Sequence, residues 1–323
     1  EERVRRQITP DSLTLKTLFG DATTVVFDEA QMLPDAGLVL KIIIDHLPEV
    51  QLYATGSSSF DIANKVAEPL TGRHHAYYLY PLAWHELTAT TAPVDQSFVL
   101  DQTLLFGSYP EIVTTTVREK KIRALELLSD AYLYKDILSF DLIKDSTPLR
   151  NLLIALALQI GSEVSYHELS KTLGINYKTV ERYIDLLEKT FVIFRVPALA
   201  RNRRNELKRK VKVYFYDCGI RNALINNFNP LDTRIDSGAL FENFIVSEFV
   251  KRDSWQSQRS NRYFWRTYDG KEIDLITEKN SVLTAYEIKL TTPERPINPT
   301  RFLSEYPEAS FGVIAKDDIA TIR

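Results

Sequence analysis

The stretch that most constrains this chain is a run of apolar and β-branched residues that ends in two carboxylates, residues 23–31 (TTVVFDEAQ). A continuous run of this kind is typical of a strand buried on both faces of a parallel sheet. Ligands bind such sheets beyond the carboxyl ends of their strands. Asp28 and Glu29 stand at that end of the run. The sequence therefore predicts a ligand-binding edge at these two acids.

Two adjacent acids after a buried strand are the pattern of a Walker B element. In such an element the first acid, here Asp28, holds Mg²⁺ directly or through water. The second acid, here Glu29, polarises the water that attacks a γ-phosphate, so the pattern predicts ATP and Mg²⁺ as ligands. A strand that merely ends in two solvated acids is the alternative for this stretch alone.

The motifs that follow strengthen the first interpretation. A second buried-strand pattern, residues 50–54, runs into small hydroxyl residues, and we expect Ser57 to stand beside the acids as a sensor. The motifs in order are DEAQ, TGSSS, LTGR and PLAWHEL, at residues 28–31, 55–59, 70–73 and 81–87. Over nearly the whole chain, this order resembles a family of bacterial and archaeal AAA-type ATPases. The resemblance implies an ATPase domain, then a helical and winged-helix region, then a restriction-endonuclease-like domain.

The resemblance also gives Arg73 a candidate role. An arginine just after a helix end in an AAA-type domain can act on the γ-phosphate, because the charge that develops there needs a fixed cation. Such an arginine acts in cis or from a neighbouring subunit, which leaves a homo-oligomer open. The alternative is a salt-bridged or solvated arginine.

One element of the family pattern is missing. A phosphate-binding loop reads G-x-x-x-x-G-K-S/T and should precede the Walker B strand by several tens of residues. The residues before Val25 contain no match, and the chain starts without a methionine, so we interpret it as part of a longer protein. That loop's backbone N–H groups and lysine form the main phosphate cradle. We therefore expect these 323 residues alone not to bind ATP tightly.

Composition adds few limits on partners and compartment. The net charge of −3 gives no general attraction to nucleic acid, so any such contact must rest on local patches. No run of about 18 apolar residues is present, which predicts no membrane span and a cytoplasmic protein. The single cysteine, Cys218, excludes an intramolecular disulfide and is expected to pack in a core.

The middle of the chain has the spacing of a helix-turn-helix. One apolar helical face covers residues 149–160, a second helix is predicted over 165–173, Gly174 begins a turn, and a third helix is predicted over 177–189. Residues 191–196 then form the pattern of a wing strand. The sequence therefore predicts a winged helix here.

Basic residues in this region predict contact with DNA. Residues 201–212 contain seven basic side chains and one acidic side chain. Such a run at a wing tip neutralises DNA phosphates. The alternatives are a winged helix used only for protein contacts and a solvated basic loop. The residues expected at the DNA are Lys178, Arg203, Arg204, Arg209 and Lys210.

The last part of the chain carries a second group of acids. Asp274 lies on one predicted strand, and Glu287 and Lys289 lie two apart on the next, where they face the same side. The three resemble the site of PD-(D/E)xK nucleases, in which acids bind Mg²⁺ and the lysine orients the nucleophile. Glu242, on a predicted helix over 240–250, matches an additional acid of such folds. The alternative is a nuclease fold retained as a scaffold without cleavage.

Together these patterns predict an α/β multidomain protein. Its parts would be the later portion of an AAA-type P-loop NTPase core (1–88), a helical region (89–148), a winged helix (149–212) and a PD-(D/E)xK nuclease-like α/β domain (213–323). The predicted function is an AAA-type ATP-binding protein or ATPase that acts with DNA. Two alternatives stay open: a Mg²⁺-dependent nuclease with a regulatory ATPase part, and a non-catalytic DNA-binding protein switched by nucleotide.

Overall fold

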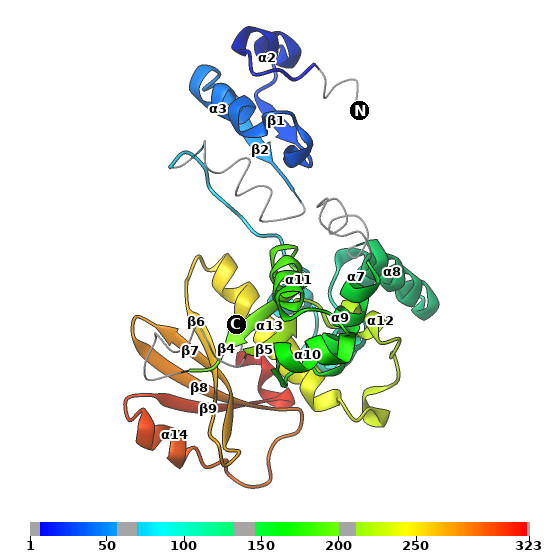
Figure 1. The fold of residues 1–323 in the computed structure, drawn as a ribbon, viewed down its shortest axis with the longest axis vertical. Coiled ribbons are helices and arrows are strands. Elements are labelled where there is room, and N and C mark those ends of the chain that lie inside the picture. Colours follow the sequence, from blue (N-terminus) through cyan, green and yellow to red (C-terminus); the bar gives the residue numbers. More distant parts are fainter. Residues whose placement is uncertain (1–6, 57–69, 71, 132–145, 200–210, 322–323) are drawn as a thin grey trace. The chain divides into compact units, whose positions relative to one another are not determined.

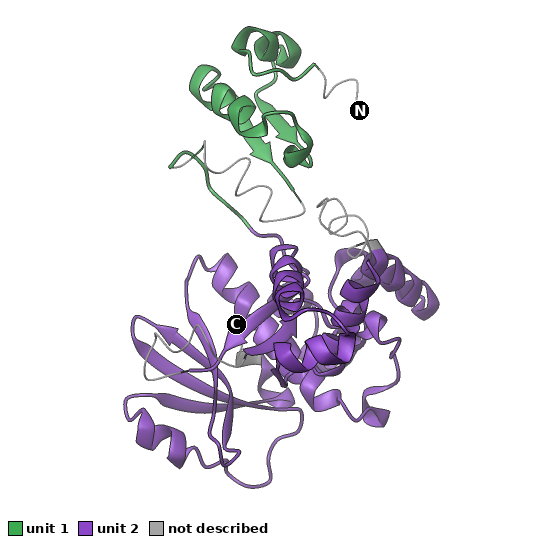
Figure 2. Ribbon diagram, in the orientation of Figure 1, with its two compact units in different colours: residues 1–77 green, residues 78–323 purple. Residues whose placement is uncertain are grey.

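The computed structural model describes residues 7–56, 70, 72–131, 146–199 and 211–321. The chain divides into two compact units, Glu1–Tyr77 and Tyr78–Arg323 (Figure 2). Within these described ranges, no helix combines the length and the apolar character that a membrane crossing needs.

The first unit is built on two parallel strands and two helices (Figure 1). Helix α2 (Ser12–Phe19) leads into β1 (Thr24–Phe27), and α3 (Ala36–His46) leads into β2 (Gln51–Ala54). Helix α2 has an N-cap at Asp11, whose carboxylate accepts from the Thr14 N–H. The two strands pair in parallel with Phe27 opposite Ala54. The unit's core gathers Phe27 and the buried face of α3.

The prediction that β1 is buried on both faces is wrong for this structure. Val26 on β1 is 60% exposed, and Tyr53 on β2 is 54% exposed. The physical reason is that the sheet has only two strands among the described residues, and its core packs on the side of Phe27. Strands of a parallel sheet are buried on both sides only where other elements, usually helices, pack against both faces of the sheet.

The sequence pattern also predicts a helix over residues 60–70 and a strand over residues 76–80. The helix predicted over 60–70 falls almost entirely outside the described residues. The strand predicted over 76–80 is not formed, because no strand pairs with this segment in the described part of the chain. Its side chains diverge instead: Leu79 is fully exposed, whereas the Tyr80 ring stacks on Tyr216 at a centroid distance of 5.4 Å.

The second unit begins with a helical layer. It contains α5 (Trp84–Thr88), α6 (Gln96–Phe106), α7 (Pro110–Thr114), α8 (Arg118–Ala131) and, later in the chain, α12 (Cys218–Leu224). Helix α12 is fixed within this layer, because the buried Asn222 amide donates to the carbonyl oxygens of Leu104 and Leu105 on α6. Asp217 caps α12 by accepting from the Ile220 N–H. It also accepts from the Ser108 N–H.

The helix-turn-helix spacing is confirmed. Helices α9 (Thr147–Leu158), α10 (Tyr166–Leu173) and α11 (Tyr177–Lys189) form at the predicted places. Ser165 caps the start of α10, and Gly174 ends it in the left-handed region at φ +64°, where glycine is favoured. Strands β3 (Glu163–Val164), β4 (Ile193–Pro197) and β5 (Val211–Phe215) complete this region as an antiparallel sheet of order β3-β5-β4.

The last region is a four-stranded mixed sheet with a long helix before it. Helix α13 (Ser237–Trp255) precedes β6 (Asn261–Arg266), β7 (Glu272–Lys279) and β8 (Val282–Lys289), and α14 (Thr300–Glu305) precedes β9 (Ser310–Ala315). The strand order is β6-β7-β8-β9. The first three strands are antiparallel, and β9 runs parallel to β8.

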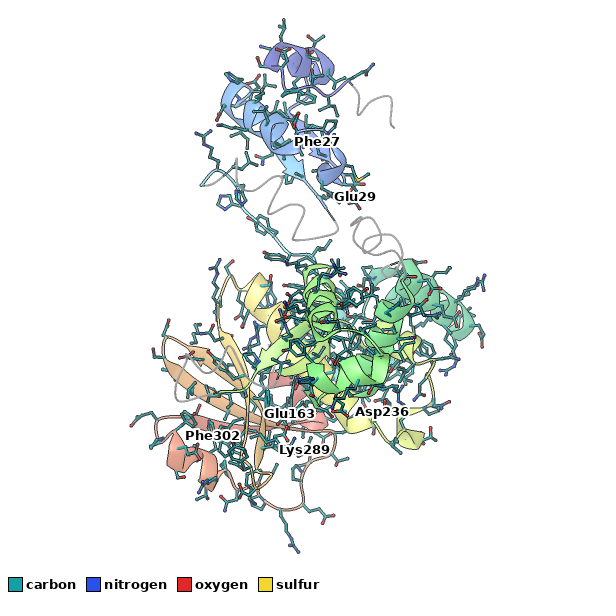
Figure 3. The ribbon with its side chains drawn as sticks, viewed as in Figure 1. Phe27, Glu29, Glu163, Asp236, Lys289 and Phe302 are labelled. Carbon is teal, nitrogen blue, oxygen red and sulfur yellow. The ribbon has the colours of Figure 1, made fainter. Side chains whose placement is uncertain are left out.

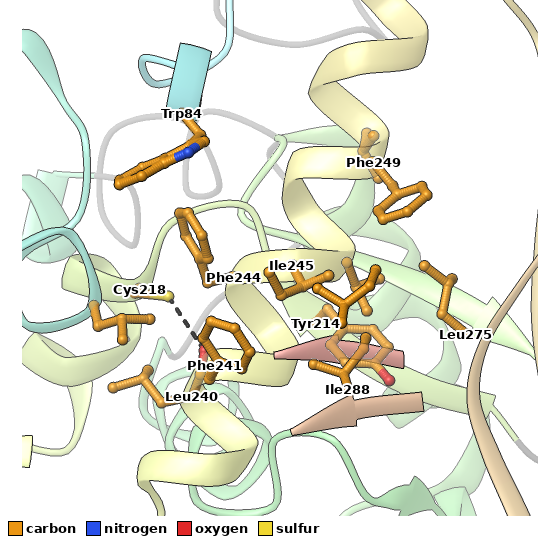
Figure 4. Packing of buried hydrophobic residues seen from close by; sticks show 14 of the residues in the cluster. Trp84, Tyr214, Cys218, Leu240, Phe241, Phe244, Ile245, Phe249, Leu275 and Ile288 are labelled. Atoms are coloured by element: carbon orange, nitrogen blue, oxygen red, sulfur yellow. Dashed lines mark hydrogen bonds between the residues drawn. The ribbon is translucent and has the colours of Figure 1, made fainter. Parts of the chain in front are cut away.

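Strand β5 belongs to two hydrophobic cores at once. Val213 and Phe215 pack with the helices α9 to α11, whereas Tyr214 packs in the core around α13 (Figure 4). The same α13 core holds Trp84 and, as expected, the buried Cys218. The domain boundary predicted between residues 212 and 213 therefore falls inside a strand that the three-stranded sheet and the α13 core share.

Candidate functional site

The first candidate site lies at the carboxyl ends of β1 and β2. Because these strands are parallel, their ends meet at one edge. There the Thr55 hydroxyl donates to Asp28 Oδ1 at 2.6 Å. The same hydroxyl oxygen accepts from the Glu29 N–H at 3.3 Å. The two strand ends are thus joined through one threonine, and Figure 3 shows Glu29 at this end of the strands.

The backbone at Glu29 is in an unusual conformation. Its φ is +53°, in the left-handed region that few residues other than glycine adopt. The turn is held by the Ala30 N–H, which donates to the Thr55 carbonyl oxygen at 2.8 Å. The Glu29 carboxylate accepts from the Gln31 side-chain amide. Hydrogen bonds on both sides therefore fix the acid in a turn that its own backbone preference would not select.

Two other residues predicted for this site are Ser57 and Arg73. Ser57 lies outside the described residues, and Thr55, which the sequence reasoning missed, supplies the hydroxyl beside Asp28. The available signal was its place as the first residue of the TGSSS run. Arg73 forms a salt bridge with Asp45 of α3, which corresponds to the alternative interpretation of this arginine.

The second candidate site lies on neighbouring strands of the four-stranded sheet. Asp274 on β7 and Glu287 and Lys289 on β8 come together, as the spacing predicted. Lys289 Nζ lies 2.7 Å from Glu287 Oε1 and 3.7 Å from Asp274 Oδ2 (Figure 3). Asp274 Oδ2 also accepts from the Ile288 N–H at 2.8 Å, which fixes this carboxylate against β8.

Glu242 of α13 has different partners. Its Oε1 lies 3.0 Å from Lys212 Nζ, and it accepts from the Tyr214 hydroxyl at 2.6 Å. Lys212 Nζ also lies 2.6 Å from Glu272 Oε1. Lys212 and Tyr214 come from β5, and both are buried, at 1% and 0% exposure. An ammonium group from the three-stranded sheet therefore holds the acid of α13 and an acid of β7.

The environment shifts the pKa values of these acids upward. Burial raises the pKa of Glu242 to about 7, the Lys212 ammonium opposes this shift, and the charge of Asp274 adds to it. Burial also raises the pKa of Glu287, again with a contribution from Asp274. A cation placed among these carboxylates would offset the cost of burying their negative charge and the repulsion between them. This group of acids therefore favours a bound cation.

The pKa values of the two lysines are also raised, which for an amine favours the charged form. Burial by itself favours the neutral amine of Lys289, but the hydrogen bond to Glu287 and the charge of Asp274 raise its pKa overall. The pKa of Lys212 is likewise raised, because Glu242 and Glu272 outweigh the effect of burial. Both ammonium groups therefore stay charged at neutral pH and compensate the acids.

The donor set fits a single small divalent cation at Asp274 and Glu287. Among the described residues, no three or more His, Cys, Asp or Glu side chains are placed to hold one metal ion, so Glu242 does not complete a set with the other two. Mg²⁺ commonly binds through one or two carboxylates and keeps several waters. Glu287 Oε2 is buried and has no hydrogen-bond partner among the described residues, so a cation bound there would satisfy this oxygen.

Sequence reasoning missed three residues of this site: Lys212, Tyr214 and Glu272. The signal was present in the strand VKVYF, residues 211–215, where a lysine and a tyrosine share one face of an otherwise apolar strand. Lys212 is the last member of the basic run in the sequence, and its burial shows that it does not belong to a solvated loop.

The residues predicted at DNA are only partly described. Lys178 is exposed in the first turn of α11, where its N–H donates to the Asn176 side chain at 2.8 Å. Arg203, Arg204, Arg209 and Lys210 lie outside the described residues.

Family models match three parts of the chain. A model described as an AAA domain matches residues 1–88, and two domains of unknown function match residues 98–231 (DUF8612) and 237–322 (DUF4143). The AAA and DUF4143 matches support an AAA-type ATPase-like family. The AAA match covers the edge at which Asp28, Glu29 and Thr55 lie.

Curated relatives are similar over most of the chain at low identity. An uncharacterized protein of Mycobacterium tuberculosis is 25% identical over 278 residues, which cover 85% of this chain and 60% of that protein. An uncharacterized protein of Haemophilus influenzae is 24% identical over 74% of this chain and 59% of its own length. One of Methanocaldococcus jannaschii is 23% identical over 84% of this chain and 63% of its own length. The chain thus spans about 60% of the length of the relatives it matches. No solved structure matches it.

Proposed function

We propose that this chain is part of an AAA-type ATP-binding protein or ATPase that acts with DNA. The observation that carries the proposal is the hydrogen bond of 2.6 Å between the Thr55 hydroxyl and Asp28 Oδ1, at the common end of two parallel strands. The match of residues 1–88 to an AAA domain supports it. Ligands of parallel α/β sheets bind at this end of the strands.

The residues have distinct roles in this proposal. Asp28 holds Mg²⁺ directly or through water, and Thr55 orients the carboxylate by donating to one of its oxygens. Glu29 polarises the attacking water, and its fixed left-handed turn keeps the acid at the strand edge. Ser57 is the sensor. Arg73 is a candidate arginine finger and would have to leave Asp45 to reach a phosphate.

The test is the substitution Glu29→Gln in the full-length gene product, provided that this product carries a phosphate-binding loop. Loss of ATP turnover with retained ATP binding is expected, because the amide keeps the shape of the acid but cannot accept a proton. Glu49→Gln, at an exposed acid after α3, is the matched control. Turnover that survives Glu29→Gln would contradict the assignment.

DNA contact is proposed through a winged helix made of α9, α10, α11 and the sheet β3-β5-β4. The support is the helix order with Gly174 in the turn, and the exposed Lys178 at the start of the third helix. Replacing Arg203, Arg204, Arg209 and Lys210 by Glu should weaken DNA binding and flatten its salt dependence, because fewer counterions are released. Unchanged affinity and salt slope would remove DNA from the proposal.

A second candidate function is Mg²⁺-dependent cleavage of nucleic acid at Asp274, Glu287 and Lys289. The observation that favours it is the contact of Lys289 Nζ with both carboxylates, beside the unpartnered Glu287 Oε2. When bound, Mg²⁺ would activate water and steady the leaving oxygen. Asp274 and Glu287 would hold the ion, and Lys289 would orient the nucleophile.

Loss of cleavage in Lys289→Ala, with cleavage retained in Lys171→Ala at an exposed position of α10, would support this second function. Absence of any cleavage by the wild-type protein with Mg²⁺ or Mn²⁺ would leave the ATPase, or a non-catalytic DNA-binding protein switched by nucleotide.

A further inference from the structure

Lys212 is a buried cation between two acids of the second candidate site. Its ammonium lies 3.0 Å from Glu242 Oε1 and 2.6 Å from Glu272 Oε1. The Phe264 ring covers it at 5.5 Å from Nζ to the centroid. Only 2% of its side chain is exposed. The group therefore cannot exchange its protein partners for water without a large cost.

The surrounding chain holds the Glu242 carboxylate through one of its oxygens. Oε1 accepts from Lys212 and from the Tyr214 hydroxyl. The carboxylate also lies against Gly161, where an added Cβ atom would lie 3.3 Å from Oε2 and 3.5 Å from Oε1. Gly161 has φ +73°, so glycine suits this position for its backbone conformation and for its lack of a side chain. Glu242 is thus held beside Lys212 and Tyr214 of β5, and among the described residues it does not complete a group of three metal-ligating side chains.

The two halves of the acid cluster differ in the exposure of the lysine that they contain and in the hydrogen bonding of their carboxylates. Glu242 and Glu272 share an enclosed lysine, whereas Asp274 and Glu287 share Lys289, whose side chain is 43% exposed, and Glu287 retains an unpartnered oxygen. An exposed lysine can turn outward when a cation arrives. An enclosed lysine cannot do so without unpacking β5.

We propose that Lys212 takes the place of a second metal ion, so that the site binds a single divalent cation through Asp274 and Glu287. Lys212 is a positioning residue in this arrangement: its ammonium neutralises Glu242 and Glu272 and keeps both carboxylates away from the ion. The inference rests on the second candidate function, because it concerns the same acids.

The arrangement also makes the site depend on the three-stranded sheet. Lys212 and Tyr214 belong to β5, which pairs with β3 and β4 and lies outside the four-stranded sheet. A fragment that starts at residue 213 would lack the cation that compensates Glu242. The acid cluster is complete only when both sheets are present.

The experiment counts Mn²⁺ ions bound by the full 323-residue chain, by electron paramagnetic resonance and by calorimetry with the metal alone. Every chain carries Asp28→Asn, which removes the other proposed Mg²⁺ ligand, and wild type here means the chain with that change alone. Wild type should bind a single ion. Glu242→Gln should still bind it with affinity changed by less than about threefold, because this acid is not a ligand. Asp274→Asn and Glu287→Gln should each weaken binding by at least about tenfold, the usual effect of losing a ligand or its close support.

Lys212→Gln tests directly whether Lys212 keeps a second metal ion from binding. With the ammonium gone, Glu242 and Glu272 become free to attract a second Mn²⁺, and the stoichiometry should rise. Lys212→Arg retains a cation and should keep a single ion, and Lys171→Gln is the exposed control. If Lys212→Gln does not fold, Glu242→Gln still tests whether Glu242 is a metal ligand, since it keeps the size of the side chain.

The outcomes separate the inference from the function on which it rests. Two ions in wild type, or loss of Mn²⁺ binding in Glu242→Gln, would overturn the role of Lys212 and leave metal-dependent cleavage standing. No Mn²⁺ binding by wild type would overturn both.

Discussion

The two candidate sites hold their acids in opposite ways. Asp28 is exposed, and one hydroxyl contacts it at the end of a short parallel pair. Glu242 is enclosed, and its charge is met by a lysine from another sheet. The first arrangement leaves a carboxylate free for a ligand to complete. The second has already been completed by the protein, which suggests that burial and compensation, more than the count of acids, decide which carboxylates can take a metal.

The largest expected effect is on the enclosed side of this comparison. Lys212→Met should lower the free energy of unfolding by about 3 kcal/mol, because it leaves buried carboxylates without their cation. Lys171→Met, at an exposed position of α10, should change it by about 0.5 kcal/mol or less. Urea unfolding of the metal-free chain followed by circular dichroism measures both. A Lys212→Met chain as stable as the control would mean that Glu242 and Glu272 need no compensation.

A pH profile sharpens the same contrast. The pKa of Glu242 is raised to about 7 in the folded chain from its usual value of 4.5. Between these two pH values the folded state binds more protons than the unfolded state, so the free energy of unfolding should fall as pH rises from about 4.5 to about 7. The fall is at most about 3 kcal/mol, because one bound proton changes this free energy by about 1.4 kcal/mol per pH unit.

Glu242→Gln is the matched variant for this profile, since it removes the titrating group and keeps its size. Unfolding in urea at a series of pH values, with a chelator present, should show a flatter profile for the variant than for wild type. Identical profiles would mean that Glu242 titrates as an ordinary exposed acid. Glu287, whose pKa is also raised by burial, accounts for any slope that remains.

The smallest effect is expected at the exposed site. Thr55→Val removes the hydrogen bonds to Asp28 and to the Glu29 N–H, each worth about 1 kcal/mol or less. Amide hydrogen exchange at Glu29 and Ala30 should become faster by about fivefold, the factor that corresponds to about 1 kcal/mol. Thr24→Val, an exposed threonine on β1, is the control. Unchanged exchange would show that Thr55 does not hold this turn.

The sequence could predict features that are local in the chain. Asp28 and Glu29 are adjacent, and the caps at Ser165 and Gly174 lie within a few residues of the helices that they delimit. The helices and strands of these regions therefore form close to the predicted residues. The meeting of Asp274 with Lys289 followed from the alternation of side chains along two neighbouring strands.

What the sequence could not predict depends on distant packing. Lys212 reaches Glu242 across 30 positions of the chain, and only the shared role of β5 in two cores brings them together. The exposure of Val26 has the same origin, because the burial of a strand depends on what covers its sheet. The residue types determine the local helices and strands. The position of β5 between two cores determines that Lys212 meets Glu242.

The central claim joins the AAA-type unit to DNA. The most direct test is ATP hydrolysis by the full-length gene product, measured with and without duplex DNA. The proposal predicts turnover that duplex DNA stimulates and that Glu29→Gln abolishes. Absence of turnover in a protein that carries a phosphate-binding loop, with or without DNA, would contradict it and would leave the acids of the four-stranded sheet as the place for chemistry.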